Sequence, residues 1–281
     1  MHIFFALLEN ILIIYIFVAI FLFLAQELVI FPRLVESKLF RKPLLVPEGI
    51  ESFFVKTADG VSLEVWTNLA SWPDAKNAAI IFHGNGETVE ARNFMGFFEA
   101  VGIPSFTFDY RGTGRSSGWP SEKGLYLDAE GVHKAVLEKT GLKSSDLVLL
   151  GNSLGSGPAS YLASKIGPLG LILMSGYAGM DILARKRAFY KYFWYTARYK
   201  LRTAEHVKAV KNSFVILAHG MLDAVIPFSH LEMIRKNIPE SNRIEIFESK
   251  DSFHNGLYDN ISKELIEKTK AFILESKASK S

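Results

Sequence analysis

Short apolar runs recur along this chain, and stretches with a helical pattern of apolar residues separate them. The runs lie near 78–82, 104–108, 147–150, 169–174, 213–218 and 243–247, and the helical stretches near 88–100, 124–139, 154–166, 228–237 and 260–275. This alternation predicts an α/β fold, with a mostly parallel central sheet and helices on both faces. Upstream, Phe53 to Thr57 and Ser62 to Trp66 flank the turn signal Asp59-Gly60, which predicts an antiparallel hairpin at one edge.

One apolar run, Leu147 to Leu150, leads into Gly151-Asn152-Ser153-Leu154-Gly155, and a helical stretch begins directly after it. The spacing G-x-S-x-G is that of a nucleophile elbow, in which a sharp strand-to-helix turn lifts a serine hydroxyl above the sheet. We expect Gly151 and Gly155 to stand where a Cβ would collide with the neighbouring strand or helix. Ser153 is therefore the predicted nucleophile.

An aspartate and a histidine follow the serine, each after a predicted strand. Asp223 comes just beyond the run that ends in His219, and His254 follows the strand near 243–248. A serine hydroxyl is a poor nucleophile until a base removes its proton, and His254 can take that proton and return it to the leaving group. Asp223 would fix the histidine tautomer and stabilise the imidazolium. Asp251, close before His254, is the alternative acid.

The strand predicted at Ala78 to Phe82 ends in His83-Gly84-Asn85-Gly86. A nucleophile elbow takes one oxyanion donor from the N–H group after the serine and a second from the loop after an earlier strand. The predicted oxyanion hole is therefore formed by the backbone N–H groups of Leu154 and Asn85.

These motifs together resemble the α/β-hydrolases over roughly residues 50 to 275. The resemblance includes Asp109-Tyr110-Arg111-Gly112-Thr113-Gly114-Arg115-Ser116, the loops around His83 and His219, and the chain order Ser153, Asp223, His254. The combination is similar to the single-span, membrane-anchored branch, which includes acyl-protein thioesterases and lysophospholipid or monoacylglycerol lipases. One departure is Ser252-Phe253, which stands where this branch usually has small residues. A bulky Phe253 is expected to narrow the pocket or shift His254.

Several polar residues near these motifs have structural interpretations. We expect His83 and His219 to hydrogen-bond their own loops, and Asp109 and Arg111 to form a buried pair that stabilises theirs. Asp223 can also act as a helix N-cap, which does not conflict with a catalytic role.

The N-terminus is almost continuously apolar from Ile3 to Leu24, and only Glu9 and Asn10 interrupt it. About 20 such residues span the hydrocarbon core of a bilayer as a helix. The rival, a cleaved signal peptide, would have a basic start and a small-x-small cleavage site, and neither is present. We therefore expect residues 3–24 to form one uncleaved membrane helix.

Lysine and arginine on its flanks predict the orientation of this helix. The leading side has none, and the trailing side has Arg33, Lys38, Arg41 and Lys42, which favours a cytoplasmic catalytic domain. A large domain can override such a bias. The predicted organisation is an anchor at 1–31, a linker at 32–50, and a hydrolase domain at 51–276 with a short cap at about 177–211.

The cap carries most of the chain's excess positive charge and many aromatic residues. The basic residues are Arg185, Lys186, Arg187, Lys191, Arg198, Lys200, Arg202, Lys208 and Lys211, and the aromatic ones are Phe189, Tyr190, Tyr192, Phe193, Trp194, Tyr195 and Tyr199. A basic, aromatic helix beside an anchored active site predicts contact with an anionic membrane surface. The alternative is an ordinary covering helix with solvated charges.

Composition excludes other chemistries. The chain has no cysteine and hence no disulfide or thiol chemistry, and no cluster with metal-ligand spacing or phosphate-binding glycine loop stands out. No cofactor and no nucleic-acid partner are expected, and the oligomeric state is left open. The prediction is a serine hydrolase that cleaves ester or thioester bonds of acyl or lipid-like substrates at a membrane. The alternatives are a peptidase, a soluble-substrate carboxylesterase, or a non-catalytic anchored binding protein.

Overall fold

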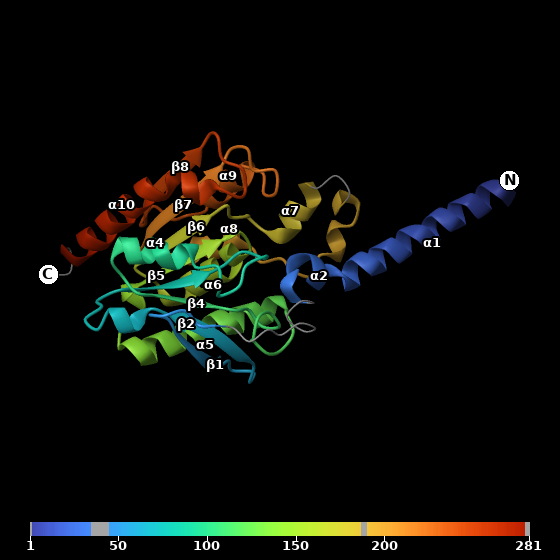
Figure 1. Cartoon of the computed structure of the whole chain (residues 1–281). Helices are drawn as coiled ribbons and strands as arrows, with labels where there is room; N and C mark the ends of the chain where they lie inside the picture. Colours follow the sequence, from blue (N-terminus) through green and yellow to red (C-terminus); the bar gives the residue numbers. More distant parts are fainter. Residues whose placement is uncertain (1, 35–44, 187–189, 279–281) are drawn as a thin grey trace.

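The computed structural model of the chain describes residues 2–34, 45–186 and 190–278. Within them, eight strands form one sheet in the order β1-β2-β4-β3-β5-β6-β7-β8 (Figure 1). The strands are β1 (Glu51–Lys56), β2 (Ser62–Thr67), β3 (Ala78–Phe82), β4 (Ser105–Phe108), β5 (Leu147–Asn152), β6 (Gly170–Met174), β7 (Phe214–Gly220) and β8 (Arg243–Ser249). The β1–β2 hairpin and the β2–β4 pair are antiparallel, and all other pairs are parallel. The predicted sheet and its antiparallel edge are confirmed.

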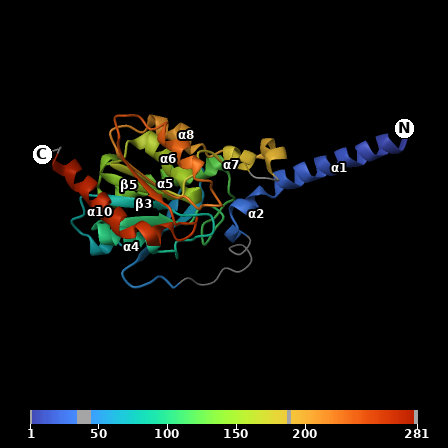
Figure 2. The ribbon, with the colours of Figure 1, turned by 90° about the horizontal axis from the view of Figure 1, so that it is seen from above.

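Helices cover both faces of this sheet (Figures 1 and 2). Those of the domain are α4 (Asn93–Val101), α5 (Glu122–Thr140), α6 (Ser156–Ile166), α7 (Met180–Lys186), α8 (Thr203–His206), α9 (Ser229–Arg235) and α10 (Leu257–Ala278). One buried cluster joins the sheet to α5, α6, α8 and α9, and a second joins it to α4 and α10. The carboxyl ends of the parallel strands are left for loops.

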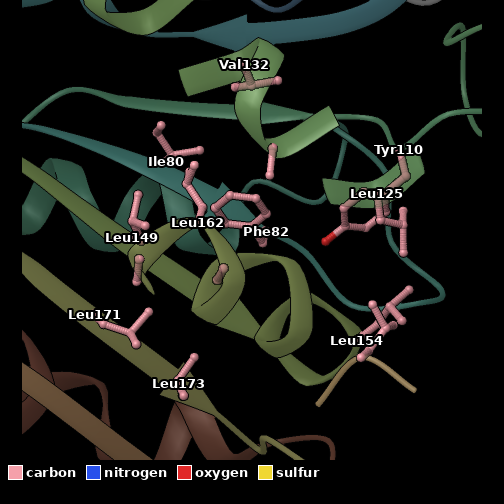
Figure 3. Packing of buried hydrophobic residues seen from close by; sticks show 14 of the residues in the cluster. Ile80, Phe82, Tyr110, Leu125, Val132, Leu149, Leu154, Leu162, Leu171 and Leu173 are labelled. Carbon is pink, nitrogen blue, oxygen red and sulfur yellow. The ribbon is translucent and has the colours of Figure 1, made fainter. Parts of the chain in front are cut away.

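Alternating side chains along each strand build the two clusters. In β3, Ile80 and Phe82 belong to the first cluster, whereas Ala79 and Ile81 belong to the second. Successive residues of a strand point to opposite faces, so a strand covered on both sides is apolar throughout. Figure 3 shows part of the first cluster, in which Ile80, Leu149 and Leu171 come from the neighbouring strands β3, β5 and β6. Full burial of such a side chain, relative to exposure, contributes roughly 1.5–3 kcal/mol to the stability of the folded state.

The helix α1 (His2–Leu24) projects away from the domain (Figures 1 and 2). Its apolar part, Phe4–Leu24, is almost wholly exposed and is long and apolar enough to cross a membrane. A helix of 21 residues is about 31 Å long, which matches a hydrocarbon core of about 30 Å.

A short second helix, α2 (Gln26–Ile30), connects α1 to the domain. Phe31 and Leu34, which follow it, are buried in the first core cluster. The predicted boundary between anchor and linker at residue 31 therefore falls inside a packed contact. Most of the predicted linker, residues 35–44, lies outside the described residues.

The expectation of a basic, aromatic helix in the cap is wrong. In the described part of 177–211, α7 is followed by the 3₁₀ turns Tyr190–Tyr192 and Trp194–Thr196 and then by the four-residue α8. The segment 190–199 packs against α1 and α2 through specific contacts. Arg198 pairs with the buried carboxylate of Glu27, and its backbone N–H donates to the Gln26 side chain at 2.8 Å.

Candidate active site

The turn after β5 presents Ser153 in a strained conformation. Its φ is 49°, in the left-handed region that a non-glycine residue rarely adopts. A Cβ on Gly155 would lie 2.0 Å from the carbonyl oxygen of Phe82, and one on Gly151 would lie 2.7 Å from that of Gly155. Both glycines are therefore required by close backbone approach, as predicted. A strained residue between a strand and a helix is the geometry that a nucleophile elbow requires.

The sheet brings Ser153, His254 and Asp223 together from the carboxyl ends of β5, β8 and β7. Ser153 Oγ lies 3.0 Å from His254 Nε2, and His254 Nδ1 lies 2.7 Å from Asp223 Oδ2. With the proton on Nδ1 donated to the carboxylate, Nε2 is left to accept the serine proton. The three side chains thus form the hydrogen-bonded relay that their order in the chain predicted.

The surroundings of Asp223 keep it ionised. Its Oδ1 accepts hydrogen bonds from the backbone N–H groups of Val225 and Ile226 at 2.8 and 2.7 Å. Burial by itself would raise the pKa of Asp223, but the hydrogen bonds from His219, His254 and Ile226 outweigh it and lower the pKa well below its ordinary value. Oδ1 of Asp223 therefore shapes the loop, while Oδ2 lies 2.7 Å from His254 Nδ1 and 3.4 Å from His219 Nε2.

Neither Asp251 nor Phe253 disturbs this arrangement. Asp251 is exposed, and the histidine nitrogen that an acid would orient is already bonded to Asp223. Phe253 is 62% exposed, and the adjacent His254 keeps its contacts with Ser153 and Asp223. Buried Ser252 holds the loop in place, because its hydroxyl accepts from Asn260 Nδ2 at 2.7 Å.

The loop after β3 lies against the elbow. Phe82 pairs with Gly151 across the parallel strands, so the loop that contains Asn85 begins beside Ser153. Leu154 is buried directly after Ser153, and its carbonyl accepts from Tyr177 Oη at 2.8 Å. The structure thus brings the two segments with the predicted oxyanion donors next to each other.

Glu87, which the sequence analysis did not single out, ties this loop to the elbow. Its Oε2 accepts from the backbone N–H of Gly84 at 2.6 Å and from Asn152 Nδ2 at 3.4 Å. Tyr110, from the next loop, donates to the carbonyl of His83 at 2.9 Å. An isolated glutamate in a polar loop gives no signal in the sequence, because such residues are usually solvated.

The two other loop histidines are structural, as expected. His83 Nδ1 lies 2.8 Å from the carbonyl oxygen of Gly84, and His219 Nε2 lies 2.8 Å from that of Ile226. Each bond closes the loop in which its histidine stands.

The expected Asp109–Arg111 pair is wrong, although both residues are buried. Arg111 instead bonds to Asp128 and Asp59, with distances of 2.8 Å to both carboxylates. Asp109 accepts from the Val89 backbone N–H at 2.9 Å, and burial raises its pKa to about 7. Asp109 and Arg111 therefore bind different segments, although they are close in sequence.

Comparisons with known proteins agree with this architecture. A family model described as "alpha/beta hydrolase fold" matches residues 78–215. In the solved structures, an esterase of Pyrococcus furiosus, Pf2001, superposes with a TM-score of 0.68 at 17% identity, covering 83% of this chain and 96% of that one. Est1E of Butyrivibrio proteoclasticus gives a TM-score of 0.62 at 17% identity, covering 81% and 99%. This chain therefore has the α/β-hydrolase fold.

Sequence relatives are more specific. The human alpha/beta hydrolase domain-containing protein 17B is 28% identical over 186 residues, which cover 65% of this chain and 62% of that protein. The lysophosphatidylserine lipase ABHD12 of Gallus gallus is 28% identical over 68% of this chain and 59% of its own length. A membrane protein of Saccharomyces cerevisiae, YNL320W, is 33% identical over 61% and 64%. The chain thus spans less than two thirds of each relative's length. This chain resembles the lipase-like branch of the fold, and the resemblance supports its assignment as a hydrolase.

Proposed function

We propose that this protein is a serine hydrolase that cleaves carboxylic ester or thioester bonds of acyl or lipid-like substrates at a membrane. The observation that carries the proposal is the hydrogen-bonded relay from Ser153 through His254 to Asp223, with Ser153 on a strained turn. The relay supports nucleophilic catalysis because each group is within direct hydrogen-bonding distance of the next.

The reaction would proceed in two halves. His254 Nε2 takes the proton of Ser153 as the oxygen attacks the acyl carbon, and the resulting oxyanion is bound by the N–H groups of Leu154 and Asn85. The imidazolium, stabilised by the Asp223 carboxylate, then protonates the leaving alcohol or thiol, and the acyl group remains on Ser153. Water, deprotonated by the same histidine, releases the acid and restores the serine.

We further propose that α1 spans the bilayer with the hydrolase domain on the cytoplasmic side. The length and exposure of Phe4–Leu24 support the span, and the match to a yeast membrane protein supports anchoring. The basic residues after the helix support the orientation, since cytoplasmic flanks are enriched in lysine and arginine. Residues 1–31 would form the anchor, 32–50 the link, and 51–276 the hydrolase domain with its cap.

Release of fatty acid from vesicles tests this function. The full chain, reconstituted in vesicles that contain a monoacylglycerol, a lysophospholipid or an S-acylated peptide, should release free fatty acid, measured by mass spectrometry. Ser153→Ala should abolish the release. Ser164→Ala is the matched control, since this serine lies on α6, the helix that follows the turn, and its hydroxyl donates to the carbonyl of Tyr161 at 2.6 Å. Equal release by wild type and Ser153→Ala would contradict the proposal.

A further inference from the structure

An apolar pocket lies between the anchor and the cap, away from the residues of the catalytic relay. Its walls come from the end of α1 and from α2 on one side, and from α7 and the segment 190–199 on the other. They include Phe21, Leu22, Leu183, Ala184, Phe193 and Trp194. The cavity has a volume of ≈ 400 Å³, within the range of roughly 300–1,000 Å³ that small-molecule sites occupy.

The polar groups of Gln26 and Thr196 in these walls are bonded within the protein. Gln26 Nε2 donates to the carbonyl of Thr196 at 2.8 Å, and Gln26 Oε1 accepts from the Arg198 N–H at 2.8 Å. The hydroxyl of Thr196 donates to the carbonyl of Phe193 at 2.7 Å. The pocket therefore offers a ligand apolar surface, and little that would bind water.

Contacts with Tyr15 fix the position of the segment 190–199 along α1. Tyr15 stacks on Phe193 with ring centroids 4.9 Å apart. The Tyr15 hydroxyl donates to the carbonyl of Tyr192 at 2.9 Å and accepts from Tyr195 Oη at 2.8 Å. From Tyr15 to Leu24 the helix rises about 14 Å, close to half of a hydrocarbon core of about 30 Å. The segment 190–199 thus runs beside the half of α1 that adjoins the domain (Figure 1).

The side chains of the segment 190–199 are of the kind found in or near the hydrocarbon core of a bilayer. Tyr192 and Tyr195 expose more than half of their surface, and Trp194 exposes 37%. The hydroxyl and carbonyl groups that meet Tyr15 are satisfied within the protein, as groups inside a bilayer must be. Lys191, whose ammonium lies 4.8 Å from the Tyr192 ring centroid, has a flexible stem that can carry its charge to the headgroups.

We infer that the segment 190–199 is embedded in one leaflet and that the pocket receives an acyl chain of a lipid from that leaflet. The inference rests on the proposed membrane span of α1. We expect an apolar cavity that adjoins hydrocarbon to be filled, because the atoms that line an empty cavity lack dispersion contacts. Lipid acyl chains are the apolar groups that lie next to it.

The pocket is also connected to the catalytic site through packed rings. Tyr199 in its wall packs on Phe31 with centroids 5.8 Å apart, and Phe31 packs on Tyr110 at 6.5 Å. Tyr110 in turn holds the carbonyl of His83 at the start of the oxyanion loop. A lipid chain in the pocket would therefore lie against the same aromatic layer that supports the loop.

Photolabelling tests this inference. The full chain carrying Ser153→Ala, which leaves the lipid intact, is reconstituted in vesicles that contain a phosphatidylcholine with a diazirine in the middle of one acyl chain. After irradiation and digestion, mass spectrometry should find the label on residues 190–199. Adding Ala184→Trp, which fills the pocket from α7, should lower that labelling about tenfold, the effect expected of overpacking a filled site.

The control is Ala271→Trp on α10, at the opposite end of the molecule (Figure 1), which should leave the labelling unchanged. Cooperative thermal unfolding checks that each variant folds, and Ala25→Trp on the opposite wall replaces Ala184→Trp if that variant does not. Absence of label from 190–199, or label there that neither tryptophan reduces, overturns the inference. Because the labelled protein is inactive by design, failure of hydrolysis alone would refute the proposed function and leave the pocket standing.

Discussion

Replacing Asp223 by asparagine separates its two roles. Asparagine keeps one carbonyl oxygen, which can still accept from the N–H groups of Val225 and Ile226, so the loop should remain folded. The amide NH₂ group, however, would face His254 Nδ1 at the 2.7 Å that the carboxylate now occupies. Two donors cannot pair, so the ring would turn or adopt the tautomer that leaves no acceptor for the Ser153 proton.

The expected loss is large because an acid of this kind both orients the base and stabilises its charge. Asparagine at the equivalent position of a serine–histidine–aspartate triad lowers kcat about 10⁴-fold, or about 5 kcal/mol of transition-state stabilisation. We expect a loss of that order for Asp223→Asn with a soluble p-nitrophenyl ester and the full chain in detergent micelles. Thermal unfolding should show that the variant stays folded.

Asp251→Asn is the matched control, since Asp251 is an exposed carboxylate in the loop that carries His254. We expect it to keep activity within about threefold of wild type, as surface substitutions usually do. A folded Asp223→Asn with activity within about tenfold of wild type, or a greater loss in Asp251→Asn, would refute the assigned acid.

Three further changes test other parts of the structure. Gly155→Ala should unfold the domain or lower its unfolding free energy by at least about 3 kcal/mol, because the new Cβ would lie 2.0 Å from the Phe82 carbonyl oxygen. Gly96→Ala is the control and should not destabilise the domain, since its Cβ would meet nothing within 4 Å; chemical denaturation compares the two variants. Glu87→Ala should lower kcat/KM about 10- to 100-fold, because it releases the loop with the proposed oxyanion donor Asn85. Glu87→Gln keeps a hydrogen-bond acceptor and should lower kcat/KM less; equal losses in the two variants would contradict this. The raised pKa of Asp109 means that the folded state disfavours the charged carboxylate, so the wild-type protein should lose about 2–3 kcal/mol of stability relative to Asp109→Asn as the pH rises from 5 to 8. A difference in unfolding free energy between the two proteins that does not change with pH would contradict this.

The fold was predictable because its strands are buried on both faces. Runs such as Ala78 to Phe82 are apolar throughout, and the glycines of the elbow have a steric cause that the spacing already implies. The positions of Asp223 and His254 at strand ends follow from the same pattern. Parallel strands end at one edge, so residues just beyond them meet.

Contacts between distant segments were not predictable in this way. The partners of Arg111 are Asp59 and Asp128, and nothing in the spacing distinguishes them from nearby Asp109. The cap's charges suggested a surface helix, whereas Arg198 pairs with Glu27 on α2. Such pairings depend on which segments pack together, and local periodicity carries no information on that.

The most direct test of the catalytic proposal is the site of covalent acylation. The full chain, mixed with a long-chain p-nitrophenyl ester and quenched with acid within milliseconds, should carry one acyl group. Peptide mass spectrometry should locate the acyl group on Ser153, and a fluorophosphonate should modify the same residue. The Ser153→Ala protein should carry neither adduct, and Ser164→Ala should carry both. An acyl group on another residue, or ester turnover with Ser153 unmodified by either reagent, would contradict the account.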